Sequence, residues 1–345
     1  MKLGIIGLPG SGKSTLFETL TKIVKDELAY KHEDRLGAIR VPDDRVDQLS
    51  SMYSPKKTIY AQVEYLLPYI TIQKPGQQRD ETVWTNVRTS DALIHVLRNF
   101  KGLGDEQATP LEDFSSLNEE MIFADLLVVE KRIERLGLDK KRGKNVDPEE
   151  VRLLENCREI LEKEQPLRSH PELSAAPQLK GYTFLSGKPM LVIFNNEDDD
   201  ESMPAGEDSF QNEKCFALRV RLEHELSQME PEEAQEYLEE YGITTSAMNR
   251  MIGLSYELLG LISFFTVGPD EVRAWTIKRD TLALDAAEVI HSDIKKGFIR
   301  AEVVAYDDLM DAGSYKEARQ QGTTRLEGKT YLVLDGDIIE FRFNV

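Results

Sequence analysis

The chain has 345 residues, of which 40% are hydrophobic, and this is enough for two or three domains with their own cores. Its formal net charge of −19 means that its average field repels nucleic acid, so RNA contact needs a local basic patch and no direct DNA binding is expected. We see no signal peptide and no apolar stretch long enough to span a bilayer, and Cys157 and Cys215 have no metal-ligand spacing. These features predict a soluble, cytoplasmic protein without membrane contact.

The N-terminal stretch combines a strand pattern, a glycine loop and a helix pattern. Leu3 to Ile6 form a short apolar run that is typical of a buried strand. Residues 7–14, GLPGSGKS, match G-x-x-x-x-G-K-[ST], and Leu16, Leu20 and Ile23 follow at helical spacing. This order predicts a phosphate-binding loop (P-loop), whose N–H groups converge on a polyphosphate at a helix N-terminus. The alternative is a glycine turn before an ordinary helix.

The residue types of this loop suit individual roles. Lys13, the candidate catalytic residue, would reach the β- and γ-phosphates, and Ser14 would bind Mg²⁺ through its hydroxyl. Gly7 and Gly12 permit backbone angles and close approaches that a Cβ would block. The loop residues expected to bind nucleotide are Gly7, Pro9, Gly10, Ser11, Gly12, Lys13, Ser14 and Thr15.

The next segments lack two features of regulatory P-loop proteins. The polar stretch from Asp26 to Asp47 offers no clear threonine for closing over a γ-phosphate, because Thr21 falls in or at the end of the predicted helix. Tyr60 to Leu67 alternate as a strand, but the continuation from Pro68 to Gly76 contains no Asp-x-x-Gly. These absences weaken the case for catalysis, and no general base can be named.

Asp91 to Arg98 form the next buried-strand candidate, with His95 between two apolar residues. No acid–base partner stands at a fixed spacing from this histidine. We therefore expect His95 to be a packed core residue rather than a catalytic one.

Two helices are predicted between this strand and the next. Asn118, followed by two glutamates, resembles a helix start, and Asp147-Pro148-Glu149-Glu150 is a second start after a polar break from Gly137 to Val146. Both helices carry a heptad-like apolar stripe, so we expect an antiparallel hairpin inserted in the fold; a partner-binding arm is the alternative. The stripe residues are Ile122, Leu126, Val129, Ile133 and Leu136 in the first helix, and Leu153, Cys157 and Ile160 in the second.

A candidate base-recognition motif follows another buried strand, Met190 to Phe194. Asn195-Asn196-Glu197-Asp198 is an Asn-x-x-Asp at the carboxyl end of that strand, where open α/β sheets bind ligands. Asp198 would accept two hydrogen bonds from guanine, and adenine offers no such donor pair, so Asn195 and Asp198 favour GTP. The alternative is a solvated acidic loop.

The remaining chain changes from α/β to mostly β. Phe216 to Val220 predict a strand, Leu222 to Met229 a helix, and Glu232 to Leu261 helical structure with a break at Gly242. Asp335-Gly336 between two apolar alternations predicts a β-hairpin. We expect a small mixed domain with a curved sheet from the segments Phe264–Val267, Val272–Ile277, Phe298–Val304, Tyr331–Leu334 and Ile338–Phe343.

Taken together, these motifs resemble the YchF-type Obg-like ATPases, a branch of the translation-factor class of P-loop proteins. The likeness covers nearly the whole chain and rests on FADLLVVEKRIERL, VPDDRVDQL and three C-terminal stretches: FFTVGPDEVRAWTIKRDT, VIHSDIKKGFIRAEVVAYDDL and RLEGKTYLVLDGDIIEFRFNV. The family implies a P-loop G domain (1–115 and 186–262), an inserted α-helical hairpin (116–185) and a ubiquitin-like (β-grasp) TGS domain (263–345). It also implies slow hydrolysis of ATP, often of GTP, and association with ribosomes.

The chain departs from the family at three places, as a divergent paralogue would. The Asp-Ile-Ala-Gly-Leu segment is replaced around Leu66 to Ile70, the first switch lacks its threonine, and the usual Asn-x-x-Glu is Asn195 to Asp198. The resemblance implies a Mg²⁺-dependent NTPase with GTP or ATP, whose helical and TGS parts contact the ribosome or another translation component. The alternative is a nucleotide-binding scaffold that does not hydrolyse and acts as a partner-binding module.

Overall fold

The computed structural model describes residues 1–22, 33–69, 81–102, 106–174, 176–204, 210, 213–240 and 246–344. The chain divides into two compact units, residues 1–38 with 64–248 and residues 39–63 with 249–345. The structure therefore groups the short segment 39–63 with the C-terminal part, and the three-domain boundaries stay a prediction. No helix in the described ranges is long and apolar enough to cross a bilayer.

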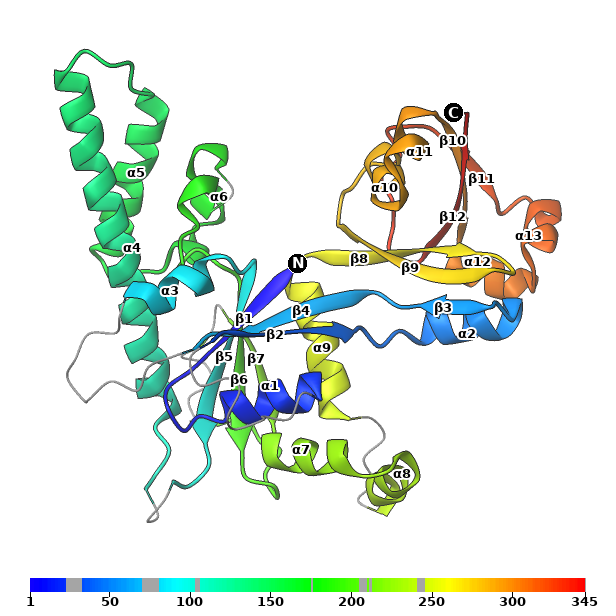
Figure 1. Ribbon diagram of the computed structural model, residues 1–345, viewed down its shortest axis with the longest axis horizontal. Coiled ribbons are helices and arrows are strands. Elements are labelled where there is room, and N and C mark those ends of the chain that lie inside the picture. The colour runs from blue at the N-terminus through cyan, green and yellow to red at the C-terminus, as the bar shows by residue number, and fades with distance from the viewer. Residues whose placement is uncertain are drawn as a thin grey trace. The chain divides into compact units, whose positions relative to one another are not determined.

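The first unit is built on a six-stranded sheet with the order β2-β4-β1-β5-β6-β7 (Figure 1). β1 lies between β4 and β5 and runs parallel to both, and β5, β6 and β7 continue the parallel arrangement. β6 is buried along its full length, as apolar strands of parallel sheets are. The bounds are β1 (Lys2–Ile6), β2 (Arg35–Arg40), β4 (Gln62–Leu67), β5 (Ala92–Asn99), β6 (Met190–Asn196) and β7 (Lys214–Leu218).

This arrangement confirms the mixed α/β fold and the strands predicted around Leu3–Ile6, Tyr60–Leu67, Asp91–Arg98 and Met190–Phe194. The sequence did not indicate β2 or α3 (Glu81–Arg88). The other helices here are α1 (Lys13–Thr21), α7 (Val220–Gln228) and α8 (Pro231–Glu240), while α9 (Ala247–Leu258) begins in this unit and lies mostly in the second. Ile23 and Gly242 lie outside the described residues.

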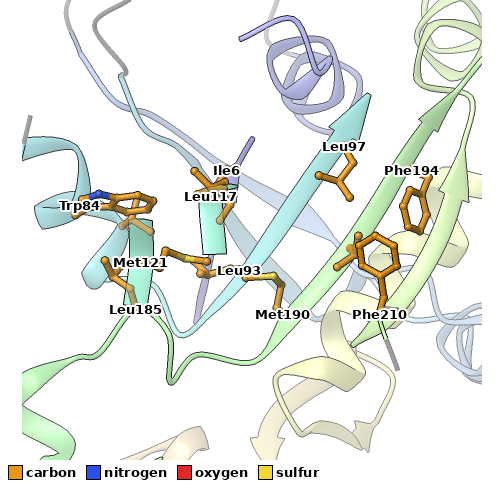
Figure 2. Close-up of a cluster of buried hydrophobic side chains, with 12 residues drawn as sticks. Ile6, Trp84, Leu93, Leu97, Leu117, Met121, Leu185, Met190, Phe194 and Phe210 are labelled. Atoms are coloured by element: carbon orange, nitrogen blue, oxygen red, sulfur yellow. The ribbon is translucent and has the colours of Figure 1, made fainter. Parts of the chain in front are cut away.

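An apolar cluster fixes a long helix, α4 (Pro110–Lys141), to this sheet (Figure 2). Leu117 and Met121 of α4 are fully buried with Leu93 of β5 and Trp84 of α3. Burial of each such side chain contributes about 1.5–3 kcal/mol. The first part of α4 is therefore a covering layer of the sheet.

The helix start predicted at Asn118 is wrong. α4 begins at Pro110, with Thr109 as N-cap and Glu112 and Asp113 in its first turn. Thr-Pro followed by acids is itself a start signal, and Asn118 lies mid-helix because Leu117 beside it packs into the core. The polar break is also shorter than predicted, since α4 continues through Gly137 to Lys141.

The second part of α4 packs against α5 (Pro148–Leu161). Asp147 caps α5 by accepting a hydrogen bond from Glu149 N at 3.0 Å, as its sequence predicted. The predicted stripes meet in one apolar cluster, in which Val129, Leu154 and Cys157 are fully buried. Three short helical segments complete this layer before β6: η1 (Leu167–Ser169), α6 (Pro171–Ser174) and η2 (Pro177–Tyr182).

The second unit contains a six-stranded sheet with the order β11-β10-β12-β8-β9-β3. Its strands are β3 (Lys57–Ile59), β8 (Leu261–Val267), β9 (Glu271–Lys278), β10 (Phe298–Ala305), β11 (Arg325–Glu327) and β12 (Asp337–Phe343). Its helices are α2 (Asp44–Tyr53), α10 (Ala283–Ile290), α11 (Ser292–Lys296), α12 (Tyr306–Ala312) and α13 (Tyr315–Gln321). Four predicted β segments correspond to β8, β9, β10 and β12.

The hairpin predicted at Asp335-Gly336 does not form. β12 pairs with β10 antiparallel and with β8 parallel, while residues 331–334 contribute only an isolated bridge through Leu332. The turn bonds to β8 instead, because Gly336 N donates to Ser263 O and Ser263 N donates to Asp335 Oδ1, both at 2.9 Å. β12 thus takes its backbone partners from β10 and β8 and not from residues 331–334.

Segment 39–63 joins this sheet through backbone pairing and an ion pair. β3 pairs with β9 in parallel, and Arg45 Nη1 lies 2.9 Å from Asp335 Oδ2. Asp43 caps α2 by accepting from Arg45 N at 3.1 Å. The stretch VPDDRVDQL, which the sequence left without secondary structure, therefore holds an N-cap and the start of α2.

Candidate functional site

The loop between β1 and α1 ends in an open helix N-terminus. Gly12 is the N-cap residue of α1, with φ of 95° in the left-handed region and no side chain to cap the first turn. Leu16 N already donates to Gly12 O at 2.9 Å, so the helix is regular from its first turn. Uncapped N–H groups and the helix dipole favour an anion at this position.

Two glycines of the loop permit contacts that another residue would prevent. A Cβ on Gly7 would lie 2.5 Å from Val96 O of the neighbouring strand. A Cβ on Gly12 would lie 2.2 Å from Asn195 Nδ2, far below any normal contact distance. The sequence predicted that both positions need glycine, and the structure supplies the atoms that each would meet.

Asn195 bonds the loop to the end of β6. Its side chain is 5% exposed; Nδ2 donates to Ser11 O at 3.0 Å, and Oδ1 accepts from Val220 N at 3.2 Å. The predicted base-reading asparagine thus lies at the P-loop, where it connects the loop with the first residue of α7. This arrangement gives Asn195 a structural role in holding the loop.

A cavity of about 420 Å³ lies between the P-loop, β6 and the start of α7. A nucleoside triphosphate suits a pocket of this size. The lining combines predicted residues (Gly10, Gly12, Lys13, Ser14, Thr15, Asn195 and Asp198) with Phe100, Asn196, Glu197, Val220 and Arg221. Gly7, Pro9 and Ser11 were predicted to bind nucleotide and are not in the lining; Gly7 and Ser11 are buried in the loop.

Two residues of the cavity lining, Asp198 and Arg221, form an ion pair. Asp198 Oδ2 pairs with Arg221, while Arg219 Nη1 donates to Asp198 O at 3.3 Å. The side chain of Arg221 is 75% exposed, so the pair is at the rim and exchanges readily with solvent. Sequence reasoning missed Arg221 and Phe100; the signal available was that both follow the carboxyl ends of sheet strands.

Among the residues that the structure describes, Ser14 is the candidate protein ligand for Mg²⁺ at the P-loop. Ser14 is exposed at the start of α1, and Lys13 Nζ donates to Leu8 O at 3.1 Å. β4 ends at Leu67, and the two described residues that follow it, Pro68 and Tyr69, supply no aspartate. Among the residues that the structure describes, no group of three or more His, Cys, Asp or Glu side chains could hold a metal. The set therefore fits a Mg²⁺ that is held by one hydroxyl, phosphates and water.

The switch segments are described only in part. Thr21 is the last residue of α1, and its hydroxyl donates to Phe17 O at 2.8 Å, in agreement with the prediction that it serves the helix. Tyr69 N donates to Asp34 Oδ1 at 2.8 Å just after β4. The rewritten stretch from Ile70 to Gly76 lies outside the described residues.

Two further residues from the sequence analysis belong to the core. His95 is fully buried in β5 and stacks on Phe114, with ring centroids 5.6 Å apart, which agrees with a packing role. Cys157 is buried in the cluster between α4 and α5, and burial raises the pKa of its thiol to about 12. A thiol with such a pKa stays protonated and unreactive at neutral pH.

Comparison with known proteins gives one consistent result. Residues 261–344 match the family model YchF-GTPase_C, described as a protein of unknown function (DUF933). The chain is 37% identical to the "Ribosome-binding ATPase YchF" of Bacillus subtilis (strain 168), covering 99% of both chains, and 35% identical to that of Mycoplasma genitalium, covering all of both. Its fold matches the structure of the Schizosaccharomyces pombe YchF GTPase with a TM-score of 0.84 and 28% identity, over 99% of this chain and 97% of that one.

Proposed function

This chain belongs to the YchF family, and we propose that it binds a purine nucleoside triphosphate, GTP or ATP, together with Mg²⁺. The observation that carries the proposal is the cavity of about 420 Å³ between an uncapped helix N-terminus and the base-motif strand. In this proposal Lys13 and the loop N–H groups hold the phosphates, Ser14 contributes one metal ligand, and Asp198 contacts the base. Mg²⁺ supplies charge neutralisation on the phosphates when it is bound.

Hydrolysis, in this proposal, is slow. Lys13 and the loop amides stabilise negative charge on the phosphates, which is the main contribution of protein groups to phosphoryl transfer. The sequence after β4 has no Asp-x-x-Gly, whose aspartate would hold the metal through water, so one common contribution to the rate is missing. The second candidate function, a nucleotide-binding scaffold without turnover, is favoured by the same absence.

A phosphate-release assay separates the two functions. We expect the purified protein to release phosphate slowly from GTP or ATP with Mg²⁺, and Lys13→Ala to abolish this release because the ammonium no longer neutralises the phosphates. Nucleotide titration of both proteins, with and without Mg²⁺, is the control for binding. Equal inactivity of the two proteins, with and without ribosomes, would leave only the scaffold; absence of nucleotide binding would contradict both functions.

Base preference depends on Asp198 in this proposal. A carboxylate accepts hydrogen bonds from the N1–H and the exocyclic amine of guanine, and adenine has no equivalent pair of donors. We expect titrations to favour GTP over ATP and Asp198→Glu to shift the ratio towards ATP, since a longer side chain misplaces the acceptor. Glu201→Asp, which changes a carboxylate of the same loop outside the cavity lining, is the matched control. Equal affinities for both bases, unchanged in Asp198→Glu, would refute the assignment.

The relatives in Bacillus subtilis and Mycoplasma genitalium are named ribosome-binding ATPases, and we propose that this chain also associates with ribosomes, hence in the cytoplasm. The helices α4 and α5 would be the inserted helical hairpin, and the second unit would include the TGS domain. The second unit has basic residues that suit such contact: Lys278, Arg279, Lys295, Lys296 and Arg300. However, Lys295 pairs with Asp285 and Glu288, and Lys296 pairs with Asp293. These pairs reduce the charge that this surface can offer to a polyanion.

A further inference from the structure

The loop that joins α4 to α5 concentrates positive charge in a chain that is strongly acidic. We define the hairpin tip as residues 135–144, the last two turns of α4 and the start of the loop. Its charged residues are Arg135, Asp139, Lys140, Lys141, Arg142 and Lys144, so five basic side chains stand with one carboxylate. The start of α5 adds Asp147, Glu149 and Glu150 at the same end of the hairpin, but Glu149 pairs with Arg152 and Glu150 with Arg132. The tip therefore keeps a local excess of positive charge in a chain with 62 acidic and 43 basic residues.

Most of this charge is not neutralised within the protein. Lys144 pairs with Asp139, with Nζ 2.8 Å from Oδ1, and this contact lowers the pKa of Asp139. Among the described residues, Lys140, Lys141 and Arg142 are exposed and make no ion pair. Three adjacent cations therefore face solvent together.

Stabilisation of the helix explains only part of this pattern. Cations in the last turn of a helix interact favourably with its dipole, which accounts for Lys140 and Lys141 at the end of α4. The effect falls off beyond that turn, and Arg142 and Lys144 lie past it. Lys144 also lies close in sequence to the start of α5, where the helix dipole favours acidic residues. Helix stabilisation therefore leaves part of the positive charge at the tip unexplained, and binding of an external anionic partner would explain it.

The hairpin tip lies away from the sheet, at the end of the packed helices α4 and α5. α4 has 32 residues, which corresponds to a length of about 48 Å. Its first part is fixed to the sheet by Leu117, and its second part to α5 by Val129 and Leu136, so the tip stands at the far end of the two helices (Figure 1). Because the backbone of the arm is packed, binding at its end costs little backbone ordering, although the exposed Lys and Arg side chains still lose rotamer freedom.

We propose that the hairpin tip docks on the phosphate backbone of folded RNA, and that it is a contact of this protein with ribosomal RNA. The proposal rests on the ribosome association proposed above and names the surface that makes it. Local positive charge is what an acidic protein needs to approach a polyanion, and phosphate contacts are made chiefly by Lys and Arg. An acidic protein partner is the competing possibility, which the experiment below distinguishes.

The experiment removes three charges from the tip and three from another surface. Lys140→Gln/Lys141→Gln/Arg142→Gln is compared with Lys278→Gln/Arg279→Gln/Arg300→Gln, a matched loss of three exposed cations in the second unit. Binding to purified ribosomes, and to protein-free ribosomal RNA, is measured from 50 to 200 mM salt. Since each phosphate contact contributes about 0.7–0.9 to the salt slope, we expect the tip variant to lose about two units of slope and at least tenfold in affinity at the lowest salt.

Unchanged nucleotide affinity in the tip variant shows that it is folded. The proposal is overturned if the tip variant binds ribosomes and protein-free RNA with the same affinity as the unaltered protein. It is also overturned if the tip variant binds ribosomes more weakly while the unaltered protein does not bind protein-free RNA, a result that would indicate a ribosomal protein as the partner. A larger loss in the second-unit variant than in the tip variant would also overturn it. If the unaltered protein fails to co-sediment with ribosomes even at 50 mM salt, the ribosome association itself fails.

Discussion

Gly12→Ala is expected to abolish nucleotide binding and to destabilise the first unit. The new Cβ would lie 2.2 Å from Asn195 Nδ2, and the residue would have to keep φ at 95°. The left-handed backbone alone costs about 1–2 kcal/mol with a Cβ, and forced overpacking typically adds about 1–3 kcal/mol. A loop that shifts to relieve this strain also loses the Nδ2 bond to Ser11 O, so we expect nucleotide affinity to fall at least 100-fold.

The same loop provides a matched control. Gly10 also has a positive φ, of 83°, but a Cβ there would meet no atom within 4 Å. Without nucleotide, Gly10→Ala should therefore show the backbone cost alone, and thermal unfolding should place it between the unaltered protein and Gly12→Ala. Asn195→Ala in the Gly12→Ala background removes the clashing amide and should recover part of the stability. Equal unfolding temperatures for the two glycine variants would contradict this account of the loop.

The parts of the fold that the sequence predicted have signals that are local and strong. The P-loop was recognisable because strand, glycines and helix occur within twenty residues, and the structure has β1, the loop and α1 in that order. β5 and β6 were predictable because both faces of a central parallel strand are buried and the strands therefore read as continuous apolar runs. The loop–Asn195 contact combines two motifs that were each predicted separately.

The parts that were missed depend on contacts far apart in sequence. Asp335-Gly336 has the local signature of a hairpin, yet its hydrogen bonds go to Ser263, which is more than seventy positions away. Asn118 looks like a helix start, yet the apolar packing of Leu117 against β5 continues the helix through it. The turn and helix propensities of single residues are weak preferences, and tertiary contacts such as these two override them.

The candidate site was predictable as a set of residues but less so as a set of roles. Asn195 was expected to read the base, whereas its amide is engaged by Ser11 O and Val220 N. Arg221 was missed although it follows the carboxyl end of a predicted strand, because its contact with Asp198 depends on the fold, which brings the two segments together. The sequence did not indicate buried charged residues such as Asp125 for the same reason.

Asp125→Ala is the second substitution for which we expect a large effect, this time on folding stability. Asp125 lies in α4 and is fully buried; its Oδ1 accepts from Arg88 Nη1 at 2.7 Å and from Leu185 N at 3.0 Å, and its Oδ2 accepts from Ser186 N at 2.7 Å. One carboxylate thus joins α3, α4 and the segment that leads into β6. Burial raises the pKa of this carboxyl, and the Arg88 guanidinium opposes that shift by favouring the charged form.

Removing Asp125 takes the acceptor from two buried N–H groups and leaves the Arg88 guanidinium, which is 18% exposed, with only the carbonyls of Thr183 and Ala124 as partners among the described residues. Breaking a buried ion pair by deleting one member costs about 3–5 kcal/mol, because the remaining charge and the two N–H groups lose their acceptor. Urea unfolding should show this loss, and Asp270→Ala, which deletes the exposed partner of Lys56, should cost less than about 1 kcal/mol. Arg88→Met with Asp125→Leu should recover stability relative to Asp125→Ala, since an apolar pair leaves no buried charge, although the two N–H groups still lose their acceptor. A cost for Asp125→Ala no greater than that for Asp270→Ala would mean that the carboxylate does not hold the long helix to the strand that carries the base motif.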